Sequence, residues 1–152
     1  MINAEVFVES KNWKKIINDP KKIILNSLKK FPKKYRFIYR KAHITILLSD
    51  NKKIKLLNKK FRKKNKPTDI LSFPFFDKKN FKNIISKKRF YLGDIVISYE
   101  EFLKKNTNDH KNNLIKILIH GFLHLLNFDH KLNKDFQIMS SIEKKIFQKI
   151  NG

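Results

Sequence analysis

The sequence contains no cysteine. Disulfide bonds and thiolate metal ligands are therefore excluded, and any bound metal must be held by nitrogen or oxygen atoms. A chain without cysteine fits a reducing compartment, so we expect a cytoplasmic location.

The sequence also lacks a long apolar segment. The longest, residues 117–126, spans about ten residues and includes two histidines, whereas a membrane helix needs about 20 apolar residues. Residues 1–10 alternate valine with polar residues and contain no basic region leading into an apolar one, so they are not a signal peptide. We therefore expect a soluble protein with no membrane partner.

Acidic residues are few. There are 13 Asp and Glu against 36 Lys and Arg, which gives a formal net charge of +23 and suggests a polyanionic partner such as RNA. Nearly all the basic residues are lysine, however, and the chain is also rich in Ile, Asn and Phe, which share A/T-rich codons with lysine. Because genome composition can supply part of the charge, the charge permits nucleic-acid binding without proving it.

The apolar patterns predict one α+β domain over residues 1–152. The helix that ends near residue 126 is apolar on more than one face, which indicates a buried central helix. Pro74 predicts that its strand lies at a sheet edge or bulge. The expected strands are 2–8, 42–48, 70–76 and 91–98, the last of them entered through a turn at Gly93. The expected helices are 13–30 (broken at Pro20), 52–61, one opening at 98 or 99, one from 107–109 to 126, and 135–150, with 77–88 as a loop. The last helix is amphipathic, and Phe136 belongs to its apolar face.

Three of the five histidines, His120, His124 and His130, fall within eleven residues. On an α-helix, His120 and His124 differ by about 40° around the axis and about 6 Å along it, so both imidazoles lie on one face. Two such imidazoles are able to bind the same tetrahedral zinc ion. Three protein ligands leave a fourth position for water, as in catalytic zinc sites. We therefore predict one zinc ion per chain, held by these three histidines.

His130 reaches the same ion only if the helix ends before it and the chain folds back. Asn127 suits that reversal, because Asn often replaces Gly in the left-handed conformation that closes a helix. Phe128 could then pack against the last helical turn. We expect His43 and His110 to be surface residues outside the metal site.

The histidine spacing also fits metzincin proteases, whose pattern is His-Glu-x-x-His-x-x-Gly-x-x-His. In this chain, Gly121 takes the place of the glutamate and Asn127 that of the turn glycine. Glycine has no proton-accepting side chain, so the protease mechanism loses its general base. A metalloprotease is therefore an alternative that this position disfavours.

The segment from His120 to His130 resembles the signature of the YbeY family of bacterial rRNA maturation factors, His-Gly-x-Leu-His-Leu-x-Gly-Tyr-Asp-His. Only Asn127 and Phe128 depart from it, and neither is a predicted ligand. Residues 57–74 resemble a second motif of the family, Leu-Asn-x-x-Tyr/Phe-Arg-x-x-x-x-Pro-Thr-Asp-Val-Leu-Ser-Phe-Pro, and the sequence Leu-Gly-Asp-Ile at 92–95 matches a third. The resemblance implies a zincin-like domain with a mixed sheet, whose central helix carries the first two ligands.

The second motif assigns the family's catalytic arginine to Arg62. A planar guanidinium can hold two phosphate oxygens and stabilise the charge that a phosphodiester gains when it is attacked. Without the resemblance, Arg62 would be interpreted as a solvated side chain in a Lys-rich loop. We expect Asp69, in the same motif, to be structural, as an Asx turn or a helix-end acceptor.

The three histidines indicate zinc dependence, and the resemblance implies a single-strand-specific endoribonuclease. The resemblance implies action in 16S rRNA 3′-end maturation and ribosome quality control. Its implied partners are the 16S rRNA precursor and the ribosome or small-subunit proteins, with a ribosome-assembly GTPase as a further candidate. Zinc would lower the pKa of a bound water to about 7, and either that hydroxide or the RNA 2′-hydroxyl is the nucleophile. Besides the metalloprotease, the alternative is a ribosome- or RNA-binding factor in which zinc is only structural. The sequence assigns no RNA-binding residues.

Overall fold

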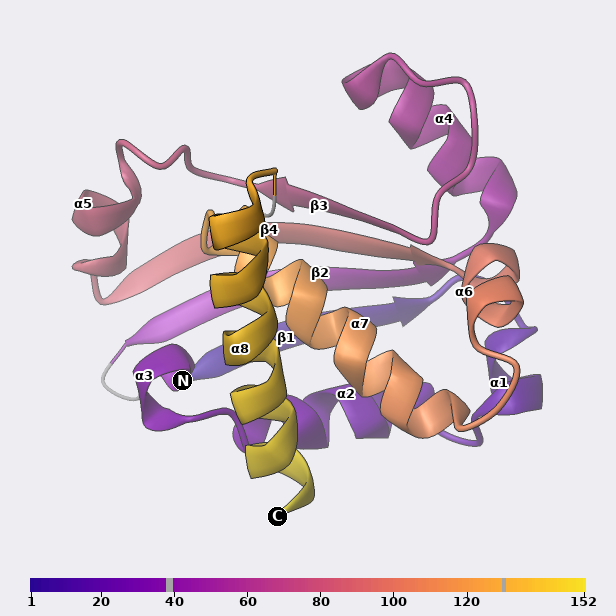
Figure 1. Cartoon of the computed structure of the whole chain (residues 1–152), viewed down its shortest axis with the longest axis horizontal. Helices are drawn as coiled ribbons and strands as arrows, with labels where there is room; N and C mark the ends of the chain where they lie inside the picture. Colours follow the sequence, from indigo (N-terminus) through magenta and orange to yellow (C-terminus); the bar gives the residue numbers. More distant parts are fainter. Residues whose placement is uncertain (38–39, 130) are drawn as a thin grey trace.

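The computed structural model describes residues 1–37, 40–129 and 131–152. Its four strands form one sheet in the order β1-β2-β4-β3, in which β1, β2 and β4 are parallel and β3 is antiparallel to β4 (Figure 1). The predicted α+β class and mixed four-stranded sheet are therefore confirmed. The strands are β1 (Ile2–Val8), β2 (Lys41–Ser49), β3 (Ile70–Pro74) and β4 (Arg89–Ser98).

Pro20 divides the first helical segment, as expected. It opens the second helix at a position where its missing N–H costs nothing, and the Asp19 carboxylate accepts a hydrogen bond of 3.1 Å from Lys22 N. The segment 77–88, expected as a loop, contains the short helix α5. The helices are α1 (Trp13–Ile16), α2 (Pro20–Lys29), α3 (Lys33–Arg36), α4 (Asn51–Arg62), α5 (Phe81–Ile85), α6 (Tyr99–Lys105), α7 (His110–Leu125) and α8 (Asn133–Asn151).

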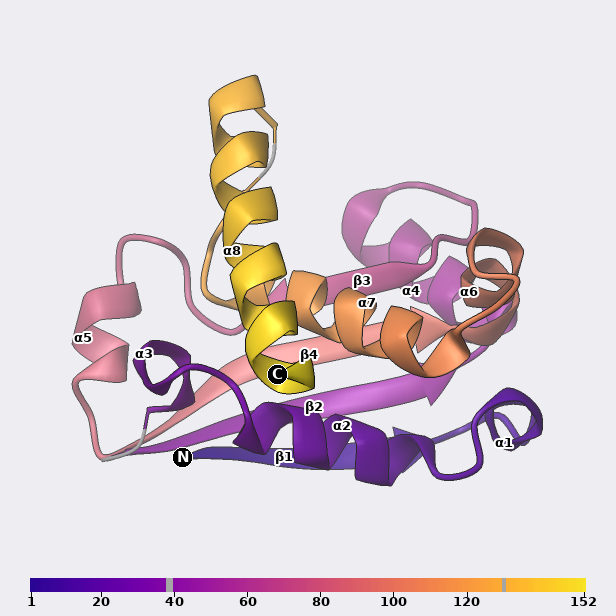
Figure 2. The same ribbon diagram turned by 60° about the horizontal axis from the view of Figure 1, so that its bottom comes forward.

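Helix α7 crosses one face of the sheet, with α2 and α8 packed beside it (Figures 1 and 2). Its residues Leu118 and Phe122 are fully buried in the main core together with Ile95 of β4. Helix α4 packs on strands β3 and β4 through a separate small cluster that contains Ile54 and Val96. The predicted buried central helix is thus confirmed as α7.

Strand β4 runs through Gly93, which was expected to form a turn before the strand. The pairing of β4 with β2 is irregular at this point, and Gly93 has a φ of +140°. A Cβ atom there would lie 2.1 Å from the carbonyl oxygen of Phe73. Glycine is therefore required where β3, the edge strand that ends at Pro74, approaches β4.

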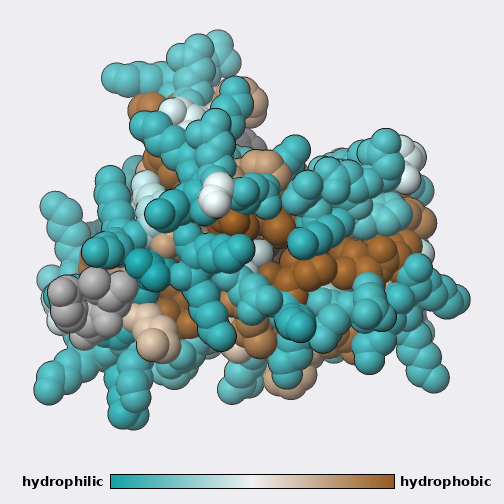
Figure 3. Space-filling model, turned by 90° about the horizontal axis from the view of Figure 1, so that it is seen from below, coloured by the Kyte–Doolittle hydropathy of each residue, from teal (hydrophilic) through white to brown (hydrophobic). Residues whose placement is uncertain are grey.

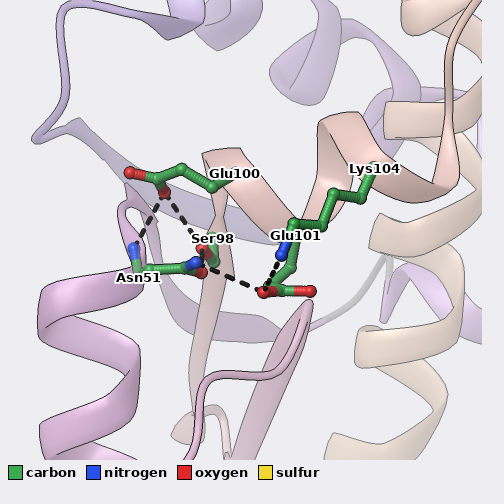
Figure 4. A network of polar contacts seen from close by, with 5 residues as sticks. All are labelled: Asn51, Ser98, Glu100, Glu101 and Lys104. Atoms are coloured by element: carbon green, nitrogen blue, oxygen red, sulfur yellow. Dashed lines mark hydrogen bonds and ion pairs between the residues drawn. The ribbon is translucent and has the colours of Figure 1, made fainter.

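A polar network at the end of β4 holds the first residue of α4 (Figure 4). The Ser98 hydroxyl, which is buried, donates to Asn51 Oδ1 at 2.6 Å. The Asn51 backbone N–H donates to Glu100 at 2.9 Å, and its side-chain amide donates to Glu101 at 3.2 Å. Lys104 pairs with Glu101 at 3.3 Å. These contacts fix the start of a helix whose other end reaches the candidate site.

The surface seen in Figure 3 is mainly hydrophilic, with hydrophobic residues gathered in strips between the polar side chains. The first turns of α8 extend beyond the sheet (Figure 2), and Phe136, expected on the buried face of this helix, is 60% exposed. In the part of the chain that the structure describes, no helix has the length and apolarity to cross a membrane.

Candidate active site

Helix α7 brings His120 and His124 together on one face. Their Nε2 atoms lie 3.2 Å apart, and the ring centroids are separated by 4.7 Å with the planes at 76°. Both side chains are half-buried. The spacing of four residues thus places the two imidazoles as helical geometry predicts.

The histidine pair fits the dimensions of a zinc site. Two nitrogens that each lie 2.0–2.1 Å from a tetrahedral zinc ion are about 3.3 Å apart, close to the separation of the Nε2 atoms of His120 and His124. The predicted third ligand, His130, lies outside the described residues. Within residues 1–37, 40–129 and 131–152, no group of three or more His, Cys, Asp and Glu side chains is placed to hold a metal.

The chain reverses directly after the histidine pair. Asn127 has a φ of +66°, its N–H donates to the carbonyl of His124, and the N–H of Phe128 donates to the carbonyl of Leu123, both at 3.0 Å. This arrangement is a Schellman motif. Phe128 packs against the main core, and the Asn127 side chain also donates to the Phe76 carbonyl at 3.2 Å. The predicted helix end at Asn127 is therefore confirmed.

Gly121 lies where α7 touches the sheet. A Cβ atom at this position would lie 2.8 Å from Ile70 Cδ1 and 3.2 Å from both Ile95 Cγ2 and Ser72 Oγ. The Ser72 hydroxyl donates to the Gly121 carbonyl at 3.1 Å. Because the helix packs so closely here, the glutamate that a metzincin carries at this position does not fit without displacing the strands.

A pocket of about 360 Å³ lies between β3 and α7. It brings Arg62, at the end of α4, to the same cavity as His120 and His124, although 58 residues separate Arg62 from His120 in the sequence. The pocket is lined by Arg62, Thr68, Asp69, Ile70, Leu71, Ser72, Pro74, His120 and His124. The three site residues predicted within the described part of the chain therefore share one pocket.

Arg62 is exposed but oriented by two contacts. Its Nη2 donates to the carbonyl of Ser72 at 3.0 Å, and its guanidinium carbon lies 5.3 Å from the centre of the Phe73 ring. A guanidinium has five N–H donors, so one hydrogen bond to β3 leaves donors able to bind phosphate. The strand thus holds the cation at the pocket while keeping it accessible.

Asn58 shapes the loop that follows Arg62. Its side chain is buried and donates to the carbonyl of Lys66 at 2.8 Å, while its own carbonyl accepts from Lys64 N at 3.2 Å. Lys63 adopts the left-handed conformation with a φ of +57°. The asparagine of the second motif therefore has a structural role that sequence reasoning did not assign.

Asp69 is structural, but not in the predicted way. It forms an ion pair of 3.2 Å with Lys105 of α6, and its backbone carbonyl accepts from Ser98 N at 2.9 Å. The hydroxyl of Thr68 lies 3.4 Å from Asp69 Oδ1. These contacts join the loop before β3 to α6, in place of the expected Asx turn or helix-end contact.

The third motif, residues 92–95, places its aspartate on the face of the sheet that α7 does not cover. Ile95 belongs to the core under α7, so the preceding Asp94 side chain points to the other face. There the Tyr91 hydroxyl donates to the Asp94 carboxylate and lies 2.7 Å from Thr45 Oγ1. Burial, together with the bond to Asp94, raises the pKa of Tyr91 to about 12. Neither Tyr91 nor Asp94 lines the pocket described above.

One neighbour of the histidine pair was missed by sequence reasoning. Glu143 of α8 places its Oε1 3.2 Å from His120 Nδ1. The two residues are 23 positions apart and belong to different helices, so no local spacing indicates the contact. His43 is exposed, as expected, whereas His110 is half-buried beside Phe102.

Comparisons with known proteins agree with the motifs. The family model described as Endoribonuclease YbeY matches residues 5–151. Endoribonuclease YbeY of Pelagibacter ubique (strain HTCC1062) is 52% identical over 152 residues, covering 97% of this chain and 95% of that protein. Endoribonuclease YbeY of Ehrlichia canis (strain Jake) is 36% identical over 149 residues, covering 96% and 92%.

A solved structure is also similar. The solution structure of TM1509 from Thermotoga maritima superposes with a TM-score of 0.56 at 25% sequence identity, covering 99% of this chain and 89% of that one. The similarity in sequence and in fold thus extends over nearly the whole chain. The chain therefore belongs to the YbeY endoribonuclease family.

Proposed function

We propose that this protein is a zinc-dependent endoribonuclease that cleaves single-stranded RNA, with residues 1–152 acting as one catalytic domain. The observation that carries the proposal is the convergence of the His120 and His124 Nε2 atoms, 3.2 Å apart, in a pocket that also contains Arg62. A pair of metal-binding imidazoles beside an accessible guanidinium suits the hydrolysis of a phosphodiester.

His120, His124 and His130 would hold one zinc ion per chain. When bound, zinc supplies Lewis acidity, which activates water at neutral pH and polarises a phosphoryl oxygen. Histidine nitrogens are suitable donors for this ion, and the chain has no cysteine to compete with them. The turn at Asn127, directly after His124, starts the chain reversal that His130 needs in order to join the pair.

Arg62 would bind the phosphate at the bond that is cleaved. Its contacts with Ser72 and the Phe73 ring hold the guanidinium at the pocket before RNA arrives. A cation that is already in position stabilises the negative charge that the phosphate gains in the transition state, and the guanidinium does not have to move during the reaction. Arg62 therefore acts as an electrostatic catalytic residue in this proposal.

We also propose that the substrate is ribosomal RNA, with roles in 16S rRNA 3′-end maturation and ribosome quality control in the cytoplasm. Support comes from the family motifs and from a formal charge of +23, which favours a polyanionic partner. The proposed partners are the 16S precursor, the ribosome or its small-subunit proteins, and a ribosome-assembly GTPase.

The decisive experiment compares purified wild type with His124→Ala on a 3′-extended 16S rRNA fragment. Both proteins are prepared identically, because contaminating ribonucleases are the main artefact. Cleavage by wild type alone supports the proposal. Equal cleavage by both proteins, or no cleavage by zinc-loaded wild type, refutes it and favours a binding factor with a structural zinc. Peptide cleavage that His124→Ala abolishes would instead support the metalloprotease.

Arg62→Lys tests the proposed phosphate contact. Lysine keeps the charge but loses the planar, bidentate donor geometry, so we expect a lower cleavage rate with little change in RNA affinity. A weaker affinity at an unchanged rate would assign Arg62 to binding alone. A single 2′-deoxy nucleotide at the cleaved position separates the two nucleophiles, because attack by water survives this change and attack by the RNA 2′-hydroxyl does not.

A further inference from the structure

We propose that Glu143 is a positioning residue, which orients His120 and fixes its tautomer for metal binding. This inference rests on the zinc site proposed above. Glu143 Oε1 lies 3.2 Å from His120 Nδ1, and His120 Nε2 faces His124 Nε2. The two ring nitrogens of His120 thus have different neighbours, a carboxylate on one side and the second histidine on the other.

The tautomer follows from the chemistry of these neighbours. An ionised carboxylate only accepts hydrogen bonds, so the ring nitrogen beside Glu143 must carry the proton. A neutral imidazole has one N–H, and placing it on Nδ1 leaves the lone pair on Nε2. That lone pair points toward the position that a metal shared with His124 would occupy. A carboxylate that orients a metal-binding histidine in this way also raises its basicity as a ligand.

Helix α8 is anchored on both sides of Glu143. Met139 lies four residues before it and Ile146 three residues after it, and both are buried with 1% exposure. On a helix these three residues share one face, so core packing directs Glu143 toward α7. The side chains of His120 and Glu143 are 30% and 31% exposed, which limits competition from water for their hydrogen bond. The carboxylate is therefore held in place by the fold.

The first test measures zinc affinity by competition with a chromogenic chelator at one fixed pH. We expect Glu143→Ala to weaken zinc binding about 10- to 100-fold, the usual effect of removing such a hydrogen-bond partner. Glu143→Gln keeps a carbonyl oxygen that can accept from Nδ1–H, so its affinity should remain closer to that of wild type. The matched control is Glu5→Ala, which removes the same charge from β1 at the opposite edge of the sheet from β3. This control should leave the affinity unchanged.

The second test needs no metal. Long-range ¹H–¹⁵N spectra report the tautomer of His120 in the metal-free protein. We expect Nδ1–H in wild type and in Glu143→Gln, and a shift toward Nε2–H in Glu143→Ala. The melting temperature of each metal-free variant shows whether the fold is intact.

The outcomes separate the two proposals. If wild type binds zinc and a folded Glu143→Ala binds it equally well with the same tautomer, the role of Glu143 is refuted while zinc dependence stands. If wild type does not bind zinc, zinc dependence fails and the inference about Glu143 fails with it. A lower zinc affinity in Glu143→Ala, together with a nearly normal affinity in Glu143→Gln, supports a positioning role. General destabilisation of the fold would not be rescued by the conservative change.

Discussion

Replacing Gly121 with alanine tests the contact that places the histidine helix against the sheet. The added Cβ would lie 2.8 Å from Ile70 Cδ1 and 3.2 Å from both Ile95 Cγ2 and Ser72 Oγ. Ile70 Cδ1 ends a side chain that is partly buried against the main core, so it can turn away only by losing part of that packing. Ile95 is fully buried and cannot do so without moving the core. The substitution therefore pushes α7 away from β3 and β4.

Two effects of opposite sign decide the magnitude. Alanine is favoured over glycine inside a helix by about 1 kcal/mol. Inserting a methyl group into a packed core costs about 1–3 kcal/mol. We therefore expect Gly121→Ala to lower the free energy of unfolding by roughly 1 kcal/mol, within a range of about 0–2 kcal/mol. Since β3 and α7 form the pocket walls, the RNA cleavage rate should fall as well.

A double-mutant cycle with Ile70→Val isolates the contact. Valine lacks the methyl group nearest to the new Cβ, and alone it costs about 0.5–1.5 kcal/mol. In the double variant, the missing methyl group of residue 70 leaves space for the new Cβ. The loss of unfolding free energy should therefore be smaller than the sum of the two single losses by at least about 0.5 kcal/mol. Urea denaturation of the four proteins gives each free energy. Additive losses, or a Gly121→Ala variant that gains the full helix preference of about 1 kcal/mol, would refute the packing argument.

Three further predictions concern the helix end, the loop after Arg62 and the opposite sheet face. Asn127→Gly should change the free energy of unfolding by less than about 1 kcal/mol, because it loses only the hydrogen bond to the Phe76 carbonyl. Asn127→Val should cost about 2 kcal/mol, because valine must adopt the left-handed backbone conformation of this position. Equal urea midpoints for the two variants would contradict this. Asn58→Ala should cost about 0.5–1.5 kcal/mol, because it removes the part-buried hydrogen bond to the Lys66 carbonyl, and an unchanged melting temperature would argue against that bond. In a spectrophotometric titration, one tyrosine should ionise near pH 12 and be missing in Tyr91→Phe. Since its folded pKa lies above the usual 10, Tyr91 stabilises the fold below pH 10 and loses this contribution as the pH rises toward 12. Ionisation near pH 10 would contradict its part-buried hydrogen bond to Asp94.

Features encoded in short stretches of sequence were predictable. Two histidines four apart on an apolar helix must share a face, because the helical repeat dictates it. Asn127 ends the helix because its backbone accepts the left-handed conformation that few other residues tolerate. Pro20 begins a helix because it lacks the N–H that a helix interior requires. The class of fold followed from the order of such local patterns.

Contacts between distant residues depended on packing that no local pattern encodes. Gly93 was expected to form the turn that leads into its strand, yet it lies inside β4, where the close backbone of β3 leaves no space for a side chain. Phe136 matches the apolar period of its helix but remains exposed, because the first turns of α8 extend beyond the sheet (Figure 2).

The sequence by itself determined the local geometry of this protein: the helix that carries the histidine pair, its end at Asn127, and the family motifs. Only the tertiary structure decided which residues meet. Arg62 shares a pocket with the histidines because β3 pairs with β4 and holds the guanidinium there, and Glu143 meets His120 because α8 packs on α7. Helical spacing is a property of the backbone and applies anywhere in a chain, whereas contacts across 23 or 58 residues exist only once the core has set the elements side by side.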